Sequence, residues 1–324
     1  MSTPVTIQRR VEDYLAERRR LGFHLRHGAL ALASFVRYLE RRGPQGPLTV
    51  EVMADWARHD KYQRGTPTTW ARRLKLLRPF TRYRQQFEPR TEIPDESVFG
   101  PLQERLTPHI YREQEIVELL AAARRLPPPG GLRPATYETL FGLLASTGLR
   151  ISEALALRDV DVDRKLGVLT VRRTKFAKSR LVPLHSSTLE ALQRYRRLRN
   201  QYVAPRPDTP FFITTEGRRS DQGLADTTTH RVFRSLCRQL GWVDRGAHDG
   251  PRIHDLRHTF AVRRLMLWHE HGTDLDQAML ALSTYLGHAK ISHTYWYLTG
   301  VPELMAAAGG KFERFAQNPG ADDD

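Results

Sequence analysis

Residues 254–297 read HDLRHTFAVRRLMLWHEHGTDLDQAMLALSTYLGHAKISHTYWY. The stretch opens with His254 and Arg257, which are three residues apart and therefore share one face of a helix. It closes with His288, Tyr295 and Tyr297. Imidazole and phenol groups transfer protons or donate hydrogen bonds, guanidinium carries a permanent positive charge, and phenol can also be a nucleophile. The stretch therefore predicts a chemical site built on helical sequence.

The N-terminal part of the chain has a helical period and no such site. Apolar residues recur at helical spacing in residues 4–22, 29–43, 48–59 and 66–87. These four expected helices predict a compact helical domain over residues 1–88. Residues 89–106 are rich in proline and charge and have no sustained period, which predicts an interdomain linker.

A second domain is expected over residues 107–315. Its sequence is helical except for residues 166–173 and 180–185, which alternate apolar with polar or β-branched residues and predict a β-hairpin. FFITT at 211–215 is a candidate third strand. The short acidic tail, 316–324, is expected to be disordered. The predicted fold is therefore mainly α with a small β-hairpin or sheet.

The charge of the chain favours a polyanionic partner. Its 324 residues carry a formal net charge of +15, and the pI is near 10.3. Nucleic acid is the commonest partner of such a basic chain. A general preference for arginine is the alternative, because only seven of the 51 basic residues are lysine.

The sequence also predicts where the protein works. It contains no run of about 18 apolar residues, so no membrane span is expected. Its N-terminus lacks the apolar middle of a signal peptide. Cys237 is the single cysteine, which rules out an internal disulfide and suits a reducing compartment. We therefore expect a cytoplasmic protein.

Four segments of the second domain carry side chains suited to a phosphodiester. A tyrosine that attacks phosphorus adds negative charge to the non-bridging oxygens, which two arginines can hold with forked donors. Arg150 and Arg257 fit this role, and each such contact lowers the barrier by on the order of 3 kcal/mol. The leaving oxygen needs a proton, which lysine gives more readily than arginine. Lys175 and Lys178, in the predicted hairpin, fit that need equally on composition.

The same segments resemble the tyrosine recombinases, the phage-integrase and Xer-type family. The resemblance rests on ASTGLRISEALALRDVDV (145–162), TKFAKSRLVPL (174–184), HDLRHTFAV (254–262) and LGHAKISHTYWYL (286–298), which come in the family's order and spacing. It covers about residues 107–305 and implies an α+β catalytic domain. The N-terminal region resembles the family's core-binding domain only in size, place and helix count. The catalytic set implied by the resemblance is Arg150, Lys175, His254, Arg257, His288 and the nucleophile Tyr297.

A DNA strand-exchange enzyme is the function that the resemblance implies. Tyr297 would form a 3′-phosphotyrosyl bond with double-stranded DNA and release a 5′-hydroxyl, with no metal, cofactor or ATP, because the covalent intermediate keeps the bond energy. The resemblance also implies a homotetramer on two synapsed DNA sites, with related recombinases and accessory proteins as further candidate partners. The ending TYWYLTGVPEL (294–304) looks closest to recombinases of mobile elements. A type IB topoisomerase and a non-catalytic DNA-binding regulator are the alternative functions.

Two neighbours of the site need separate interpretation. Tyr295 lies two residues from Tyr297, or about 200° around a helix, so only one of them can face a pocket. We expect Tyr295 to be a packing aromatic. Glu153, three residues after Arg150, is expected to orient an arginine.

A metal site is the alternative interpretation of the histidines. His254 and His258 are four residues apart, which is a zinc-ligand spacing. The zinc-protease motif needs glutamate directly after the first histidine, and Asp255 stands there. We therefore expect no metal and a packing or supporting role for His258.

Overall fold

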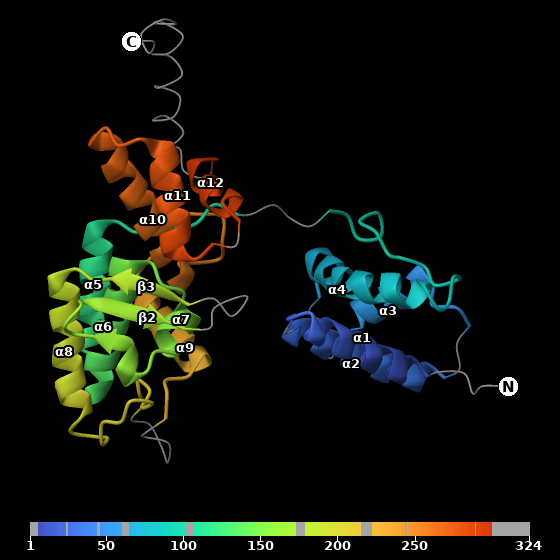
Figure 1. Ribbon diagram of the computed structural model, residues 1–324, viewed down its shortest axis with the longest axis horizontal. Helices are drawn as coiled ribbons and strands as arrows, with labels where there is room; N and C mark the ends of the chain where they lie inside the picture. Colours follow the sequence, from blue (N-terminus) through green and yellow to red (C-terminus); the bar gives the residue numbers. More distant parts are fainter. Residues whose placement is uncertain are drawn as a thin grey trace, which may run out of the picture. The chain divides into compact units, whose positions relative to one another are not determined.

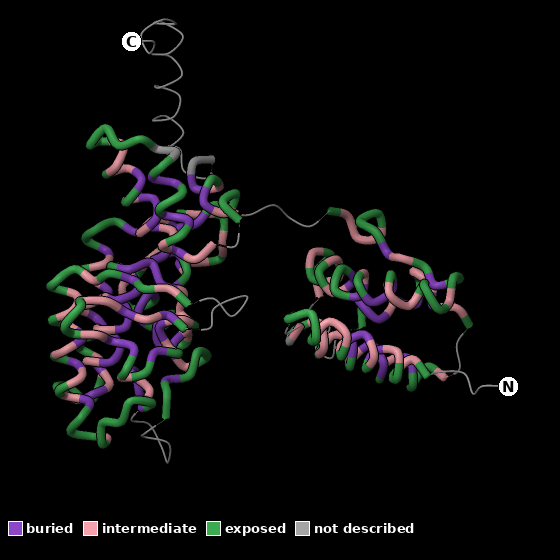
Figure 2. The backbone as a smooth tube through the Cα atoms, in the orientation of Figure 1, coloured by how far each residue is buried: buried purple, intermediate pink, exposed green. Residues whose placement is uncertain are grey.

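The computed structural model shows two compact units, Met1–Arg105 and Leu106–Asp324 (Figure 1). Among the residues that the structure describes, no helix combines the length and apolar character needed to cross a membrane. Each unit has its own hydrophobic core, which Figure 2 shows as buried segments inside each unit. The described stretches are residues 6–23, 25–43, 46–59, 65–101, 106–172, 179–214, 222–243, 245–288 and 290–299.

Four helices form the described part of the N-terminal unit. They are α1 (Ile7–Arg20), α2 (Arg26–Arg42), α3 (Val50–Arg58) and α4 (Pro67–Gln85). The side-chain oxygens of Thr6, Thr49 and Thr66 accept N–H groups in the first turns of α1, α3 and α4, which satisfies donors that helix ends leave unpaired. Phe35 and Trp56 meet edge to face in the core at 5.3 Å. The helical period of the sequence therefore predicted these elements correctly.

The segment expected to be a linker contacts the N-terminal unit along much of its length. The Glu92 N–H donates to the Leu48 carbonyl at 2.9 Å, and the Glu92 carboxylate accepts the Val50 N–H at 2.5 Å. Further along, the ring of Phe99 lies 5.7 Å from that of Trp70. The segment after residue 88 therefore packs on the N-terminal unit at Glu92 and at Phe99.

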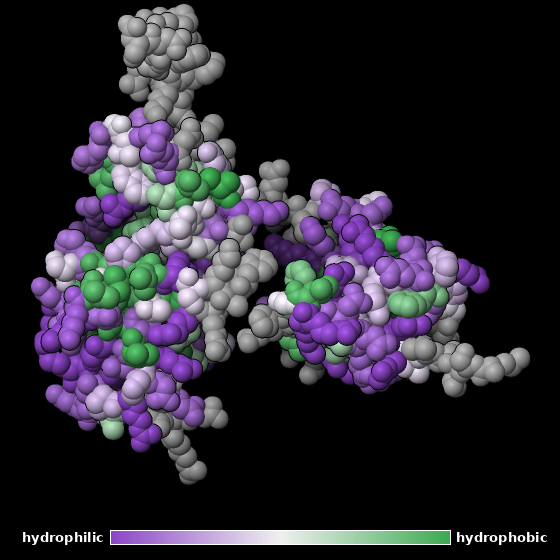
Figure 3. Space-filling model, in the orientation of Figure 1, coloured by the Kyte–Doolittle hydropathy of each residue, from purple (hydrophilic) through white to green (hydrophobic). Residues whose placement is uncertain are grey.

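The C-terminal unit contains a three-stranded antiparallel sheet in the order β1-β2-β3. The strands are β1 (Val162–Asp163), β2 (Val168–Val171) and β3 (Arg180–Pro183). Strands β2 and β3 form the predicted hairpin, with Val171 opposite Arg180. The outer face of the sheet is open: Leu181 is exposed, as is Leu166 before β2, and Figure 3 shows apolar residues gathered where β2 and β3 lie in Figure 1.

The prediction of a strand at FFITT is wrong for the described residues 211–214. Phe211 and Phe212 are fully buried, which accounts for the apolar run. The backbone hydrogen bonds of this segment go to two different parts of the chain, however. The Phe211 N–H donates to the Leu157 carbonyl, and the Phe212 carbonyl accepts the Leu224 N–H. The pairs Arg158–Pro210 and Ile213–Gly223 are isolated bridges and do not extend into a strand. The third strand of the sheet is β1 instead.

Helices form most of the described part of the C-terminal unit. Helix α6 is buried on most sides and contacts α5, α8 and α10, so it is the centre of the main core. A second cluster joins α10, α11 and α12. The helices are α5 (Glu113–Arg124), α6 (Leu132–Thr147), α7 (Ile151–Leu155), α8 (Ser186–Arg199), α9 (Asp226–Gln239), α10 (Ile253–Glu270), α11 (Leu275–Leu286) and α12 (Ser292–Thr299).

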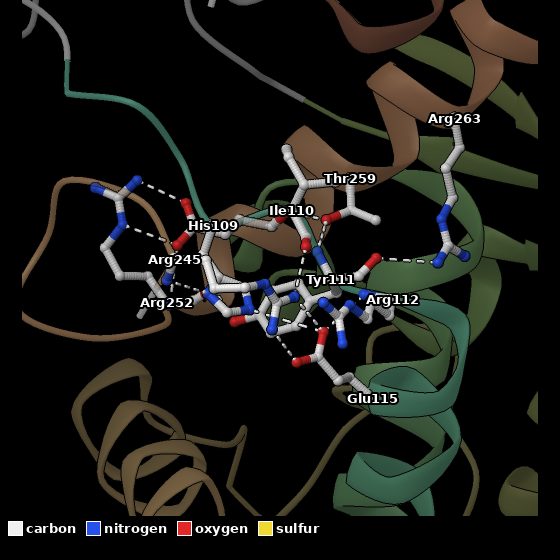
Figure 4. A network of polar contacts seen from close by, with 10 residues as sticks. His109, Ile110, Tyr111, Arg112, Glu115, Arg245, Arg252, Thr259 and Arg263 are labelled. Atoms are coloured by element: carbon white, nitrogen blue, oxygen red, sulfur yellow. Dashed lines mark hydrogen bonds and ion pairs between the residues drawn. The ribbon is translucent and has the colours of Figure 1, made fainter. Parts of the chain in front are cut away.

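The first residues of the C-terminal unit are tied to α10 by polar contacts (Figure 4). The Tyr111 hydroxyl donates to the Arg252 carbonyl at 2.9 Å, and the Tyr111 N–H donates to the Thr259 hydroxyl at 2.9 Å. Nη1 and Nη2 of Arg245 donate to the Glu115 carboxylate, at 2.5 and 2.6 Å. Because α10 carries His254 and Arg257, this network fixes the helix that supplies two of the six expected site residues.

Gly148, which ends α6, should not tolerate a side chain. Its φ is +62°, and an added Cβ would lie 2.5 Å from Cδ1 of Phe260. Gly167 is a matched control, because its φ is +65° and a Cβ would meet nothing within 4 Å. We expect Gly167→Ala to cost about 1 kcal/mol of stability through the backbone alone. Gly148→Ala should cost roughly 2–4 kcal/mol, because overpacking is added. Urea unfolding measures both, and equal losses would contradict this packing.

Candidate active site

Arg150 is placed by the turn between α6 and α7. Gly148 ends α6 in the left-handed conformation, and Arg150 is the N-cap of α7. The Glu153 carboxylate accepts the Arg150 backbone N–H at 3.1 Å and its Nη1 at 2.8 Å. Nη2 of Arg150 also donates to the Gly287 carbonyl at 3.3 Å. The contact through which Glu153 was expected to orient an arginine is therefore present. The bond to Gly287 connects Arg150 to the end of α11.

Arg257 lies one turn into α10 and is 2% exposed. Its Nη1 donates to the Gly148 carbonyl at 2.7 Å, and its Nη2 donates to the Leu286 carbonyl at 2.8 Å. Burial, and next the positive charge of Arg150, lower the pKa of Arg257 to about 10. The guanidinium is still protonated at neutral pH, so two positive charges lie together here.

Arg180, at the start of β3, is a site neighbour that the sequence did not reveal. Its Nη1 and Nη2 donate to the two oxygens of Glu153 at 3.1 and 2.8 Å. Its Nε donates to the Tyr285 carbonyl at 2.8 Å. The signal available in the sequence was weak, because an arginine beside a hairpin is ordinarily exposed, whereas the Arg180 side chain is only 14% exposed.

Glu153 is ionised in this cluster. Burial alone would raise the pKa of its carboxyl, but the hydrogen bonds and charge of Arg180, with those of Arg150, lower the pKa to about 2. The carboxylate accepts from both guanidinium groups and from a backbone N–H. Such a carboxylate is held in one orientation and cannot act as a proton donor at neutral pH.

His254 and His258 lie next to each other on α10. Their ring centroids are 4.8 Å apart, with the rings nearly perpendicular. Although His254 keeps exposed surface, burial of its ring, and next the charge of Arg257, lower its pKa to about 4. His254 is therefore neutral at physiological pH and can accept a proton. No group of three potential metal-ligating side chains occurs among the described residues.

Helix α12 buries Tyr297 and exposes Tyr295. Tyr297 is 2% exposed and packs in the cluster of α10 and α11, whereas Tyr295 is 38% exposed. The Tyr297 ring is nearly parallel to that of His288, with centroids 6.3 Å apart, and lies 5.5 Å from that of His258. Nδ1 of His288 is 2.7 Å from the Thr294 hydroxyl. The two tyrosines therefore face apart, as their spacing predicts, and Tyr297 is on the side of the histidines.

Lys175 and Lys178 lie outside the described residues, between β2 and β3 in the sequence. Five of the six expected site residues can therefore be placed. They come from the α6–α7 turn, α10, the turn after α11, and α12, and they gather around the carbonyl end of α11. Two guanidinium groups beside a tyrosine and neutral imidazole form an arrangement suited to phosphoryl transfer.

Residues 110–301 match the family model described as the phage integrase family. The match spans more than half of the chain, and the protein therefore belongs to this family, the tyrosine recombinases. The resemblance carried by the sequence motifs is thus confirmed.

Similar proteins agree with this family. Integrase/recombinase y4rB of Sinorhizobium fredii is 42% identical over 315 residues, which cover 95% of this chain and 98% of that protein. Tyrosine recombinase XerD of Caulobacter vibrioides is 32% identical over 244 residues, covering 74% and 73%. A solved Tn1549 transposon integrase in complex with transposon right end DNA has a TM-score of 0.65 at 18% identity, covering 95% of this chain and 99% of that chain. The predicted fold, mainly helical with a small sheet, is confirmed.

Glu153→Gln should lower stability at neutral pH by roughly 3 kcal/mol, because one pKa unit corresponds to about 1.36 kcal/mol. A depressed pKa contributes stability that is fully present above pH 4.5 and is lost as the pH falls toward 2. The difference between wild type and variant should therefore shrink between pH 7 and pH 3.5, as measured by urea unfolding. Glu138→Gln, which removes a pair with the exposed Arg124, should cost less than about 1 kcal/mol at both pH values. If the stability difference between wild type and Glu153→Gln were the same at pH 7 and pH 3.5, Glu153 would not be an ionised, buried carboxylate.

Proposed function

We propose that this protein is a site-specific DNA recombinase or integrase that breaks and rejoins DNA through a 3′-phosphotyrosyl intermediate. The observation that carries the proposal is the convergence of Arg150, His254, Arg257, His288 and Tyr297 from separate elements. Arg150 and Arg257 both contact the turn that ends α11, and Tyr297 faces the histidines. Membership of the phage integrase family supports the same activity.

In the proposed reaction, the Tyr297 hydroxyl oxygen attacks a backbone phosphorus. The bond from phosphorus to the tyrosine oxygen forms, and the bond to the 5′-oxygen breaks, so a 3′-phosphotyrosyl bond and a 5′-hydroxyl result. A 5′-hydroxyl from another strand reverses the step and joins the new strand. Since each step exchanges one phosphoester for another, the reaction consumes neither ATP nor a metal-activated water.

The candidate site residues have different roles in this reaction, according to their charge. Arg150 and Arg257 stabilise the negative charge of the transition state through forked donors. The proton that the Tyr297 hydroxyl loses on attack passes to a neighbouring imidazole, for which His254, neutral with its pKa lowered to about 4, is the proposed acceptor. His288 is stacked beside Tyr297 and orients the phenol. Lys175, in the hairpin loop, would protonate the leaving 5′-oxygen, with Lys178 as the alternative donor.

DNA is the proposed partner of both units. Basic side chains are exposed on α1 and α4 of the N-terminal unit, among them Arg19, Arg20, Arg72, Lys75 and Arg82. We assign residues 1–88 to DNA clamping and residues 107–315 to catalysis, in a homotetramer on two synapsed sites. The integrase/recombinase y4rB and the Tn1549 transposon integrase favour a mobile element as the source, and action on bacterial DNA places the protein in the cytoplasm.

Tyr297→Phe should abolish covalent capture of DNA while binding persists, because the phenylalanine keeps the ring but lacks the attacking oxygen. The substrate is a nicked duplex that carries the DNA site selected by the wild-type protein from a random-sequence library. Denaturing gels measure the protein–DNA adduct. The matched control is Tyr295→Phe, which should capture DNA normally, since Tyr295 points away from the histidines. Loss of the adduct in Tyr295→Phe alone would reassign the nucleophile.

Recombination should exceed relaxation of supercoils when two selected sites are present on one plasmid. Deletion or inversion between the sites is the expected product, and it should form equally well in EDTA. Relaxation without exchange would favour the topoisomerase alternative. Sequence-specific binding with no adduct at all would favour the non-catalytic regulator, and a strict requirement for a divalent ion would contradict the metal-free mechanism.

A further inference from the structure

Arg180 contributes a third guanidinium to the candidate active site. We propose that Arg180 is a positioning residue: by pairing with both oxygens of Glu153, it keeps the Arg150 guanidinium available to a DNA phosphate. The inference rests on the proposed function, because it assigns Arg150 to the phosphate. It adds a residue that was absent from the expected catalytic set.

The contacts of Glu153 show why a third arginine matters. Arg180 reaches one carboxylate oxygen with each terminal nitrogen, at 3.1 and 2.8 Å, whereas Arg150 reaches only one oxygen with Nη1. Forked, two-oxygen pairing is the stronger and more directional arrangement for an arginine and a carboxylate. Glu153 is therefore committed to Arg180, and only one of its side-chain bonds goes to the Arg150 guanidinium.

The charge of the cluster leads to the same conclusion. Arg150, Arg180 and Arg257 supply three positive charges against the single negative charge of Glu153, which leaves a net charge of two for an incoming phosphate. Without Arg180, Glu153 would neutralise Arg150 and could draw it into two-oxygen pairing. The phosphate would then meet one uncompensated positive charge instead of two.

Arg180 also joins the hairpin to the turn that carries His288. Its Nε donates to the Tyr285 carbonyl at 2.8 Å. A Cβ on Gly287 would lie 2.9 Å from Nη1 of Arg180, so the guanidinium packs directly on the turn after α11. The strand that follows the Lys175 loop is thereby fixed to the turn that precedes His288.

The test compares cleavage with binding in Arg180→Gln, Glu153→Gln and the double variant. The probe is the nicked duplex with the selected site, at saturating protein and in single turnover. Arg180→Gln should slow adduct formation by about tenfold or more, with DNA affinity changed by less than about threefold. The double variant should cleave several times faster than Arg180→Gln, because removing the Glu153 charge restores the net charge of two. A merely structural role would make the double variant no faster than Arg180→Gln.

Arg172→Gln is the matched control. Arg172 lies on the other side of the hairpin loop and pairs with Asp161, away from Glu153, with 53% of its side chain exposed. Its variant should form the adduct at the wild-type rate once DNA is bound. Arg180→Lys keeps the charge and should fall between wild type and Arg180→Gln, and circular dichroism melting checks that each variant is folded.

Each outcome decides the inference. Wild-type cleavage by Arg180→Gln, or a double variant no faster than Arg180→Gln, would overturn it. Unfolding of both Arg180→Gln and Arg180→Lys would assign Arg180 to stability and would also overturn it. Failure of the wild-type protein to form any adduct would instead refute the proposed function.

Discussion

The carbonyl end of α11 holds together side chains that would otherwise repel one another. Arg180 donates to the Tyr285 carbonyl, Arg257 to the Leu286 carbonyl and Arg150 to the Gly287 carbonyl. Like charges about 4 Å apart near a protein surface repel by about 4 kcal/mol, and Glu153 supplies only one negative charge. The last carbonyls of a helix carry partial negative charge. The end of α11 therefore supplies further charge compensation for the three arginines.

This constraint explains the glycines beside the arginines. Gly148 and Gly287 end α6 and α11 with φ of +62° and +66°, a conformation that glycine adopts without strain. The Gly148 carbonyl accepts from Arg257, and the Cα of Gly287 leaves room for Arg180. Both glycines thus end a helix where a guanidinium must approach the backbone. A side chain at Gly287 would displace Arg180, and one at Gly148 would meet the ring of Phe260.

The sequence predicted the helices and the side chains whose spacing is local. His254 and Arg257 share a helix face, and Tyr295 and Tyr297 face apart, because both relations follow from helical period. Arg180 escaped prediction because its partner Glu153 is 27 positions away, and only the tertiary fold brings them together. The 211–214 segment was mistaken for a strand because burial, rather than sheet pairing, explains its apolar residues. The contacts of the expected linker with the N-terminal unit could not be predicted, because its hydrogen bonds and its one aromatic pair follow no sequence period.

Access to solvent decides the order in which a DNA phosphate would meet the site. The Arg150 side chain is 34% exposed and His254 is at the surface, whereas Arg257 and Tyr297 are each 2% exposed. On the proposed chemistry, a phosphate oxygen contacts Arg150 first, and its charge then relieves the repulsion between the guanidinium groups. Tyr297 is packed against α10 and α11, so its attack requires α12 to shift. With eight residues, α12 is the shortest of these three helices, and displacing it breaks the least packing. On the proposed chemistry, the free protein would thus keep Tyr297 covered, and phosphate binding would come before attack.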